Sequence, residues 1–119
     1  MPKKLLFIDG SPLLTVTFED FFRAIGFEVT SASTNYEASQ LLNKFEFDLI
    51  ITDFDTPCIN GNKIIGELTQ RSIQTPVIAH VCDKNNINYS PLVKEVVLKP
   101  ASIFHLLEAI DKSLSIAVS

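Results

Sequence analysis

The 119-residue chain contains only two cysteines and has no apolar run close to the length of a membrane span. A membrane-spanning helix needs roughly 18 or more largely apolar residues in succession, whereas the apolar residues of this chain come in short runs. Cys58 and Cys82 lack the Cys-x-x-Cys spacing of a redox or zinc site, so we expect free thiols that are buried or partly buried. These features favour a protein without a membrane segment, in a reducing compartment.

Basic residues are few and scattered along the chain. Ten Lys and Arg residues stand against fourteen Asp and Glu residues, which gives a net charge of −4. Direct nucleic-acid binding is not expected, because the neutralisation of phosphates needs clustered Lys and Arg. Near the amino terminus the apolar run before Asp9 is only four residues long, too short for the apolar core of a signal peptide. We therefore expect a cytoplasmic protein with one domain over residues 1–119.

Short apolar runs alternate with segments of helical periodicity. The apolar runs predict strands at 4–8, 27–32, 49–52, 76–81 and 95–98. Capping patterns and apolar spacing predict helices that begin at Ser11–Pro12, Thr34, Asn60–Gly61 and Ile103. Segment 84–93 is rich in Asn and broken by Pro91, so it should form at best a short or irregular helix. The pattern predicts an α/β fold: a doubly wound, five-stranded parallel sheet of the flavodoxin-like kind, with right-handed crossovers.

Polar and charged residues follow several of the predicted strands. Asp9, Asp53, residues 81–82 and Lys99 all stand where a strand ends. An aspartate at such a position is often only a turn former or a helix cap. However, the carboxyl ends of parallel strands share one edge of the sheet, and ligands bind in the crevice at that edge. The joint placement therefore predicts a common pocket.

Two stretches carry a family resemblance that extends over essentially the whole chain. DFDTPCING, residues 53–61, resembles the phospho-acceptor stretch of the receiver domains of two-component response regulators. In that stretch an aspartate is followed by proline four residues later and then by Asn-Gly or Asp-Gly. VLKP, residues 97–100, is similar to the end of the fifth strand in the same family. The resemblance implies a receiver-type fold.

The resemblance also implies roles for particular residues. Asp53 would accept a phosphoryl group from a sensor histidine kinase or a phosphotransfer protein, and Lys99 would pair with that phosphate. Mg²⁺ would be held by Asp9, Asp53 and Asp55, the last through its backbone carbonyl. Attack by a carboxylate on phosphorus requires such cations, because negative charge accumulates on the oxygens. A downstream protein target or output domain is implied, and a homodimer is possible.

Three positions depart from the family pattern. Gly10 replaces the second of two adjacent acids, so we expect weak Mg²⁺ binding. Val81 replaces the Thr or Ser whose hydroxyl bonds the phosphoryl group, and Val96 replaces the aromatic residue that moves with it. His80 and Tyr89 are the nearby polar aromatic residues, and we expect both to be ordinary surface or edge residues. The chain thus resembles an atypical receiver with an altered switch.

Other functions are compatible with parts of the pattern. One is a pseudo-receiver that acts as a protein-interaction module without phosphorylation. Another is a phosphatase, because residues 53–56 also resemble the Asp-x-Asp-x-Thr motif of haloacid-dehalogenase-type enzymes. Asp111 stands alone where those enzymes need paired acids, so we do not expect an enzyme. A flavodoxin-like cofactor binder would need a Ser/Thr-rich phosphate loop, for which DGSPLLT, residues 9–15, is a poor candidate. Both a stand-alone protein and a part of a longer regulator remain open.

Overall fold

A single parallel sheet forms the centre of the protein. The structure is a computed structural model that describes residues 2–54, 56–88 and 90–118, except for the side chains of 116–118. The strand order within these residues is β2-β1-β3-β4-β5. The strands are β1 (Lys4–Ile8), β2 (Glu28–Ala32), β3 (Leu49–Thr52), β4 (Val77–Val81) and β5 (Val93–Leu98). The expected doubly wound, five-stranded parallel sheet is confirmed, with β1, β3 and β4 in its interior.

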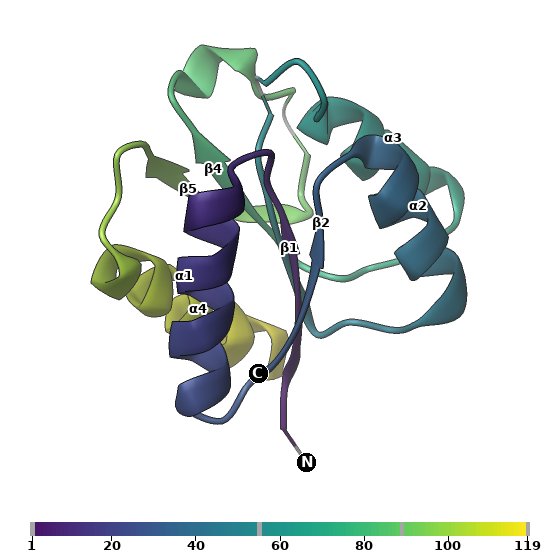
Figure 1. Cartoon of the computed structure of the whole chain (residues 1–119). Coiled ribbons are helices and arrows are strands. Elements are labelled where there is room, and N and C mark those ends of the chain that lie inside the picture. The colour runs from purple at the N-terminus through teal and green to yellow at the C-terminus, as the bar shows by residue number, and fades with distance from the viewer. Residues whose placement is uncertain (1, 55, 89, 119) are drawn as a thin grey trace.

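Helices cover both faces of this sheet (Figure 1). In the described ranges they are α1 (Pro12–Ala24), α2 (Asn35–Lys44), α3 (Gly61–Gln70), α4 (Ile103–Val118) and a short 3₁₀ turn, η1 (Lys84–Asn86). Helices α1 and α4 lie on one face, and α2 and α3 lie on the other. None of the helices in the described part of the chain combines the length and the apolar character that crossing a bilayer requires.

Side-chain caps fix where the first three helices begin. Ser11, Thr34 and Asn60 each accept a backbone N–H from three residues further on, at 3.2, 3.1 and 3.2 Å. The predicted helix starts are therefore confirmed. The carboxylate of Glu37 binds the hydroxyl and the N–H of Ser33 instead of the N–H of Thr34. Hydrogen bonds from the Ser33 side chain and backbone hold the pKa of Glu37 below its usual value.

The core consists of two layers separated by the sheet. Alternating strand residues face opposite layers, as the pleat of a strand requires. The layer beneath α1 and α4 includes Leu5, Phe7, Phe18, Phe22, Ile51, Leu106 and Ile110. The layer beneath α2 and α3 includes Leu6, Ile8, Ala38, Leu42, Ile50, Ile64 and Leu68. Because β1 and β3 are covered on both faces, their sequences are almost continuously apolar.

The connection from β4 to β5 contains only the 3₁₀ turn η1 as a helical element among its described residues. The Asn62 side chain holds this segment against α3: its Nδ2 donates to the Asn86 carbonyl at 2.7 Å, and its Oδ1 accepts the Asn88 N–H at 2.8 Å. The expectation of a short or irregular helix is confirmed. Strand β5 begins at Val93, two residues earlier than predicted. Tyr89 lies outside the described residues.

Two predictions about burial were wrong. His80 was expected at the surface or an edge, but it is only 2% exposed, because β4 is an interior strand whose five residues are all buried. Cys58 and Cys82 were expected to be buried or partly buried, but both residues are exposed. Their exposure follows from their positions in connecting loops, one before α3 and the other directly after β4.

Gly61 allows α3 to begin directly against the end of β3. A Cβ atom at this position would lie 2.5 Å from the Phe54 ring and 2.7 Å from the backbone carbonyl oxygen of Asp53. Neither distance is tolerable, and a backbone carbonyl cannot rotate away as a side chain can. Glycine is therefore required here for close approach of two backbones.

We predict that Gly61→Ala destabilises the fold by about 1–3 kcal/mol, because the added methyl group overpacks a rigid site. Gly66→Ala is the matched control on the same helix, since a Cβ there meets no described atom within 4 Å outside its own stretch of helix. The control should leave stability unchanged or raise it by up to about 1 kcal/mol through helix propensity. Urea unfolding of the two variants provides the measurement. Equal stabilities of both variants would contradict the packing argument.

Candidate functional site

Three charged residues follow β1, β3 and β5 at one edge of the sheet. Backbone hydrogen bonds fix each of them just beyond its strand. The Asp9 N–H donates to the carbonyl of Ala32 at 3.1 Å, and the Asp53 N–H donates to that of Ile8 at 2.9 Å. The Lys99 N–H donates to the Val81 carbonyl at 2.7 Å. The three side chains thus leave the backbone at the same rim, although 90 positions separate the first from the last.

The side chains of these three residues meet. Lys99 Nζ lies 2.7 Å from Asp53 Oδ1 and 3.8 Å from Asp9 Oδ2. Asp9 is 3% exposed and Asp53 1% exposed, whereas the Lys99 side chain keeps 20% of its surface in solvent. The convergence of Asp9, Asp53 and Lys99 that was expected from the strand ends is therefore observed. The chemical roles of the three residues stay predictions.

The ammonium group is the positive partner of two buried carboxylates. Burial alone lowers the pKa of Lys99, but the hydrogen bond and the charge of Asp53, with smaller contributions from Asp9 and Cys82, outweigh it. The pKa of Lys99 is therefore raised above its usual value of 10.5. Lys99 remains protonated at neutral pH and offsets part of the charge of both carboxylates.

Backbone N–H groups orient the two carboxylates. Asp9 Oδ1 accepts the Ser11 N–H at 2.8 Å, and Asp53 Oδ1 accepts the Phe54 N–H at 3.1 Å. The hydroxyl of Thr52 donates to the Asp53 carbonyl at 2.8 Å inside the core. The carboxylates are therefore held in place before any ligand arrives.

The site suits a hard cation. Carboxylate oxygens are the ligands that Mg²⁺ prefers, and Asp9 and Asp53 already converge on one positive charge. Asp9 Oδ2 is buried and has no hydrogen-bond partner among the described residues. Asp55, the third predicted ligand, lies outside those residues, so its part in the site stays a prediction. Within the described ranges, which omit Asp55, no three His, Cys, Asp or Glu side chains gather at one point.

Val81 and Val96, where the sequence predicts an altered switch, differ in their surroundings. Val81 is fully buried and packs in a small cluster with Phe54, Ile65 and Ala79. Its side chain contributes to the core and carries no hydroxyl. Val96 is 43% exposed on β5, next to a connection that lacks an α-helix in its described part.

A reciprocal asparagine contact ties the loop between β3 and α3 to α2. Asn35 Nδ2 donates to the Asn60 carbonyl at 3.0 Å, and Asn35 Oδ1 accepts the Asn60 N–H at 2.7 Å. The Asn35 N–H also donates to the carbonyl of Cys58 at 3.3 Å. Sequence reasoning missed this contact, since the two asparagines lie 25 positions apart and nothing in the local pattern pairs them.

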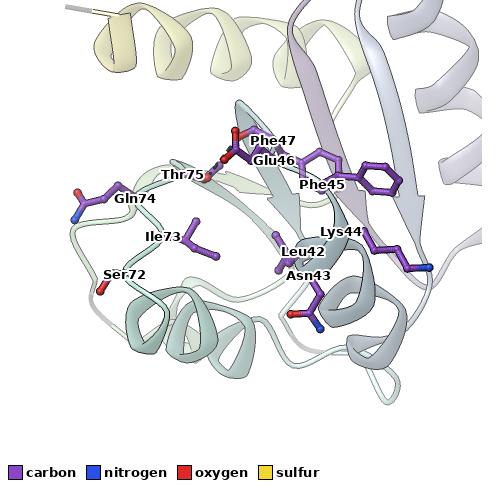
Figure 2. Close-up of a pocket in the computed structure, with 10 residues that line it drawn as sticks. All are labelled: Leu42, Asn43, Lys44, Phe45, Glu46, Phe47, Ser72, Ile73, Gln74 and Thr75. Carbon is purple, nitrogen blue, oxygen red and sulfur yellow. Dashed lines mark hydrogen bonds between the residues drawn. The ribbon is translucent and has the colours of Figure 1, made fainter.

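A separate pocket of about 680 Å³ opens far from Asp53 along the strands (Figure 2). Its lining comes from the segments that precede β3 and β4, so it lies at the amino ends of these strands, whereas Asp53 lies at the carboxyl end. The lining residues are Leu42, Asn43, Lys44, Phe45, Glu46, Phe47, Ser72, Ile73, Gln74 and Thr75. Thr75 Oγ1 donates to the Phe47 carbonyl at 3.4 Å across this pocket. The pocket thus has no part in the site around Asp53.

The family model for the response regulator receiver domain matches residues 5–111, which include Asp9, Asp53 and Lys99. The chain belongs to this family. Receiver domains are modules of two-component signalling, and this assignment confirms the resemblance noted in residues 53–61 and 97–100. It also favours a signalling module over the haloacid-dehalogenase-type phosphatase that residues 53–56 resemble.

Curated relatives are considerably longer than this chain. Regulator of RpoS from Escherichia coli (strain K12) is 28% identical over 102 residues, which cover 82% of this chain and 30% of the relative. Probable transcriptional regulator ycf29 from Porphyra purpurea is 32% identical over 80 residues, or 66% of this chain and 38% of the relative. The chain therefore spans about a third of the length of these relatives.

Solved receiver structures share the fold. The response regulator TrrA of Thermotoga maritima, in complex with Mg²⁺-BeF, has a TM-score of 0.81 at 24% identity, covering 94% of this chain and 99% of that one. The chemotaxis response regulator CheY4 of Vibrio cholerae has a TM-score of 0.81 at 23% identity, covering 96% and 100%. At these identities the likeness establishes the fold alone.

We predict that Lys99→Met destabilises the receiver substantially, because it leaves two buried carboxylates without their cation. Removing one partner of a buried ion pair costs about 3–5 kcal/mol, and the partial exposure of Lys99 places this case at the lower end. The double variant Asp53→Asn/Lys99→Met should recover part of the loss, since one buried charge is gone. Urea denaturation of the three proteins tests this. An unchanged stability of Lys99→Met would disprove the role of the ion pair.

The stabilisation of the fold by Lys99 should decrease at high pH. Because its pKa is raised in the folded state, the contribution is fully present below the usual pKa of 10.5 and is lost as the pH rises through the folded-state pKa. The stability difference between the wild type and Lys99→Met should therefore stay constant from neutral pH to about 10.5 and then shrink. Denaturation of both proteins across alkaline pH measures this. A difference that closes well below that point would contradict the raised pKa.

Proposed function

We propose that this receiver domain accepts a phosphoryl group on Asp53 from a sensor histidine kinase or a phosphotransfer protein. The observation that carries the proposal is the 2.7 Å contact between Lys99 Nζ and Asp53 Oδ1, with Asp9 Oδ2 3.8 Å from the same ammonium. A nucleophilic carboxylate with a fixed cation beside it is the arrangement that phosphoryl transfer needs.

The proposed reaction moves one phosphoryl group between two side chains. A carboxylate oxygen of Asp53 attacks the phosphorus of a phosphohistidine, a P–O bond forms, and the P–N bond breaks. The bonding electrons leave with the imidazole, which takes up a proton. Lys99 stabilises the charge that develops on the phosphoryl oxygens and afterwards pairs with the phosphate. Because the product is an acyl phosphate on the protein itself, we expect a signalling event without enzymatic turnover.

We propose that Asp9 and Asp53 hold Mg²⁺ at this site. When bound, the ion would supply positive charge in addition to that of Lys99 and would neutralise negative charge on the phosphoryl oxygens. The structural support is the buried pair of carboxylates, of which Asp9 Oδ2 has no hydrogen-bond partner in the described residues. Gly10 follows Asp9 without a carboxylate, so we expect the ion to bind weakly. Asp55 stays a predicted ligand outside the described residues.

An exposed apolar surface beside the site suits a protein partner. Leu13 is 79% exposed and Val16 is 53% exposed, and both lie on α1, which begins three residues after Asp9. Exposed apolar residues that cluster at a functional rim often mark interaction surfaces. We propose that the phosphodonor contacts this end of α1. A downstream target or output domain and a homodimer remain further proposals, and so does a cytoplasmic location.

A second candidate function is a pseudo-receiver that binds partners without being phosphorylated. The buried Val81 side chain favours it, because this residue cannot donate a hydrogen bond to a phosphoryl oxygen. The exposed Val96 favours it as well, because no aromatic side chain is present there to change position. Under this proposal Lys99, Asp9 and Asp53 would serve only as a structural ion cluster.

We predict that acetyl phosphate labels the wild-type protein in the presence of Mg²⁺ and that Asp53→Asn abolishes the label, because the amide is not nucleophilic. Asp20→Asn is the matched control: the same chemical change at an exposed position of α1 should leave labelling intact. Intact-protein mass spectrometry, which detects the added phosphoryl group, is the measurement. Labelling that survives in Asp53→Asn would assign the acceptor to another residue.

Beryllium fluoride distinguishes the two candidate functions. Fluorine NMR detects the adduct of beryllium fluoride with the protein. An adduct that forms in the presence of Mg²⁺ and is absent from Asp53→Asn would support the phosphoryl-accepting function. The absence of an adduct at every Mg²⁺ concentration, in a protein that remains folded, would instead support the pseudo-receiver.

A further inference from the structure

The hydroxyl of Thr56 is a polar group that the proposed mechanism does not use. Thr56 Oγ1 is buried and has no hydrogen-bond partner among the described residues. Hydroxyl groups removed from water are normally bonded, because an unbonded one loses its hydration without compensation. An unsatisfied hydroxyl beside a functional site therefore points to a ligand that satisfies it.

This hydroxyl faces the gap left by the missing side chain at position 10. Among the described residues, apart from its chain neighbours, a Cβ atom built on Gly10 would have Thr56 Oγ1 as its nearest contact, at 3.9 Å. Gly10 directly follows Asp9, which is 3% exposed and whose Oδ2 also lacks a hydrogen-bond partner in the described part of the chain. Two buried oxygens that lack a hydrogen-bond partner in the described residues, Asp9 Oδ2 and Thr56 Oγ1, thus lie on either side of Gly10, the first of them 3.8 Å from the Lys99 ammonium.

The loop holds Thr56 in this position. The Ile59 N–H donates to the Thr56 carbonyl at 3.3 Å, and the two residues form a β-bridge. The Ile59 side chain is only 1% exposed and anchors the turn in the core. The asparagine contact between Asn35 and Asn60 ties the same turn to α2. The hydroxyl is therefore preorganised.

We propose that the Thr56 hydroxyl oxygen is an additional ligand of Mg²⁺, on the side where Gly10 offers no carboxylate; this inference rests on the proposed phosphoryl-accepting site. Mg²⁺ takes oxygen ligands, and threonine hydroxyls serve in this role in phosphate-binding loops. A neutral hydroxyl attracts the ion less than a carboxylate does. Thr56 thus gives the site a third side-chain oxygen without adding a negative charge next to Asp9 and Asp53.

Isothermal titration calorimetry with Mg²⁺ alone tests this ligand in the whole chain. Thr56→Val keeps the shape of the side chain and loses the oxygen, so Mg²⁺ affinity should fall by about tenfold. Thr56→Ser keeps the hydroxyl and should bind like the wild type. Thermal unfolding without metal shows whether Thr56→Val is folded, and its apo stability should equal or exceed that of the wild type, because an unsatisfied buried hydroxyl has been removed. Unchanged Mg²⁺ affinity in Thr56→Val, or equal loss in Thr56→Ser, would overturn the proposal.

Gly10→Asp supplies an independent test. The position has room for a side chain, since no described residue other than its chain neighbours lies closer to the added Cβ than 3.9 Å. The new carboxylate should raise Mg²⁺ affinity and take over the contact with the ion, so Thr56→Val should cost less affinity in the Gly10→Asp background than in the wild type. If Thr56→Val lowered Mg²⁺ affinity by the same factor in both backgrounds, Thr56 would not contact the ion on the side of residue 10.

Labelling of Asp53 by acetyl phosphate separates this inference from the proposed function. A labelled wild type whose Thr56→Val variant binds Mg²⁺ normally would overturn only the role of Thr56. A wild type that binds Mg²⁺ through Thr56 but is never labelled would overturn only the phosphoryl-accepting function. If the wild type binds no Mg²⁺ at any concentration, the proposed ligand is disproved, whatever the labelling shows.

Discussion

The contact of one ammonium group with two buried carboxylates is the interaction on which the functional edge of this protein depends. Asp9 and Asp53 are almost fully enclosed, and two negative charges so close together would repel each other without Lys99. The parallel strand order makes the contact possible, since it brings the ends of β1, β3 and β5 to one rim. The fold and the site are therefore coupled: the sheet positions the charges, and the charges are tolerable only in this arrangement.

Most of the fold could be predicted from the sequence because its signals are local. Apolar runs identified the five strands, and the side chains of Ser11, Thr34 and Asn60 marked helix starts by bonds that span three residues. The joint placement of Asp9, Asp53 and Lys99 at strand ends was also visible, because strand polarity alone implies a shared rim. These are properties of segments, and each can be read without knowing what packs against them.

The features that were missed depend on contacts between distant segments. The burial of His80 follows from its strand lying between β3 and β5, which no local pattern of β4 reveals. The early start of β5 accompanies a register shift opposite Val77 and Ile78. The pairing of Asn35 with Asn60 and the tight packing of Gly61 both join elements far apart in sequence. The position of Asp55 remains a prediction.

The close approach at Gly61 has a mechanical consequence for Asp53, the proposed phosphoryl acceptor. The first turn of α3 lies so near the Asp53 carbonyl and the Phe54 ring that not even a methyl group fits between them. The Asp53 carbonyl cannot move at this contact without a shift of the backbone, so the position of Asp53 is fixed on this side. Lys99 instead follows the edge strand β5, which comes after the irregular η1 connection and pairs within the sheet with β4 only, among the described strands. A displacement of Asp53 would therefore be accommodated by movement of Lys99 and β5, which are less constrained than the packed start of α3.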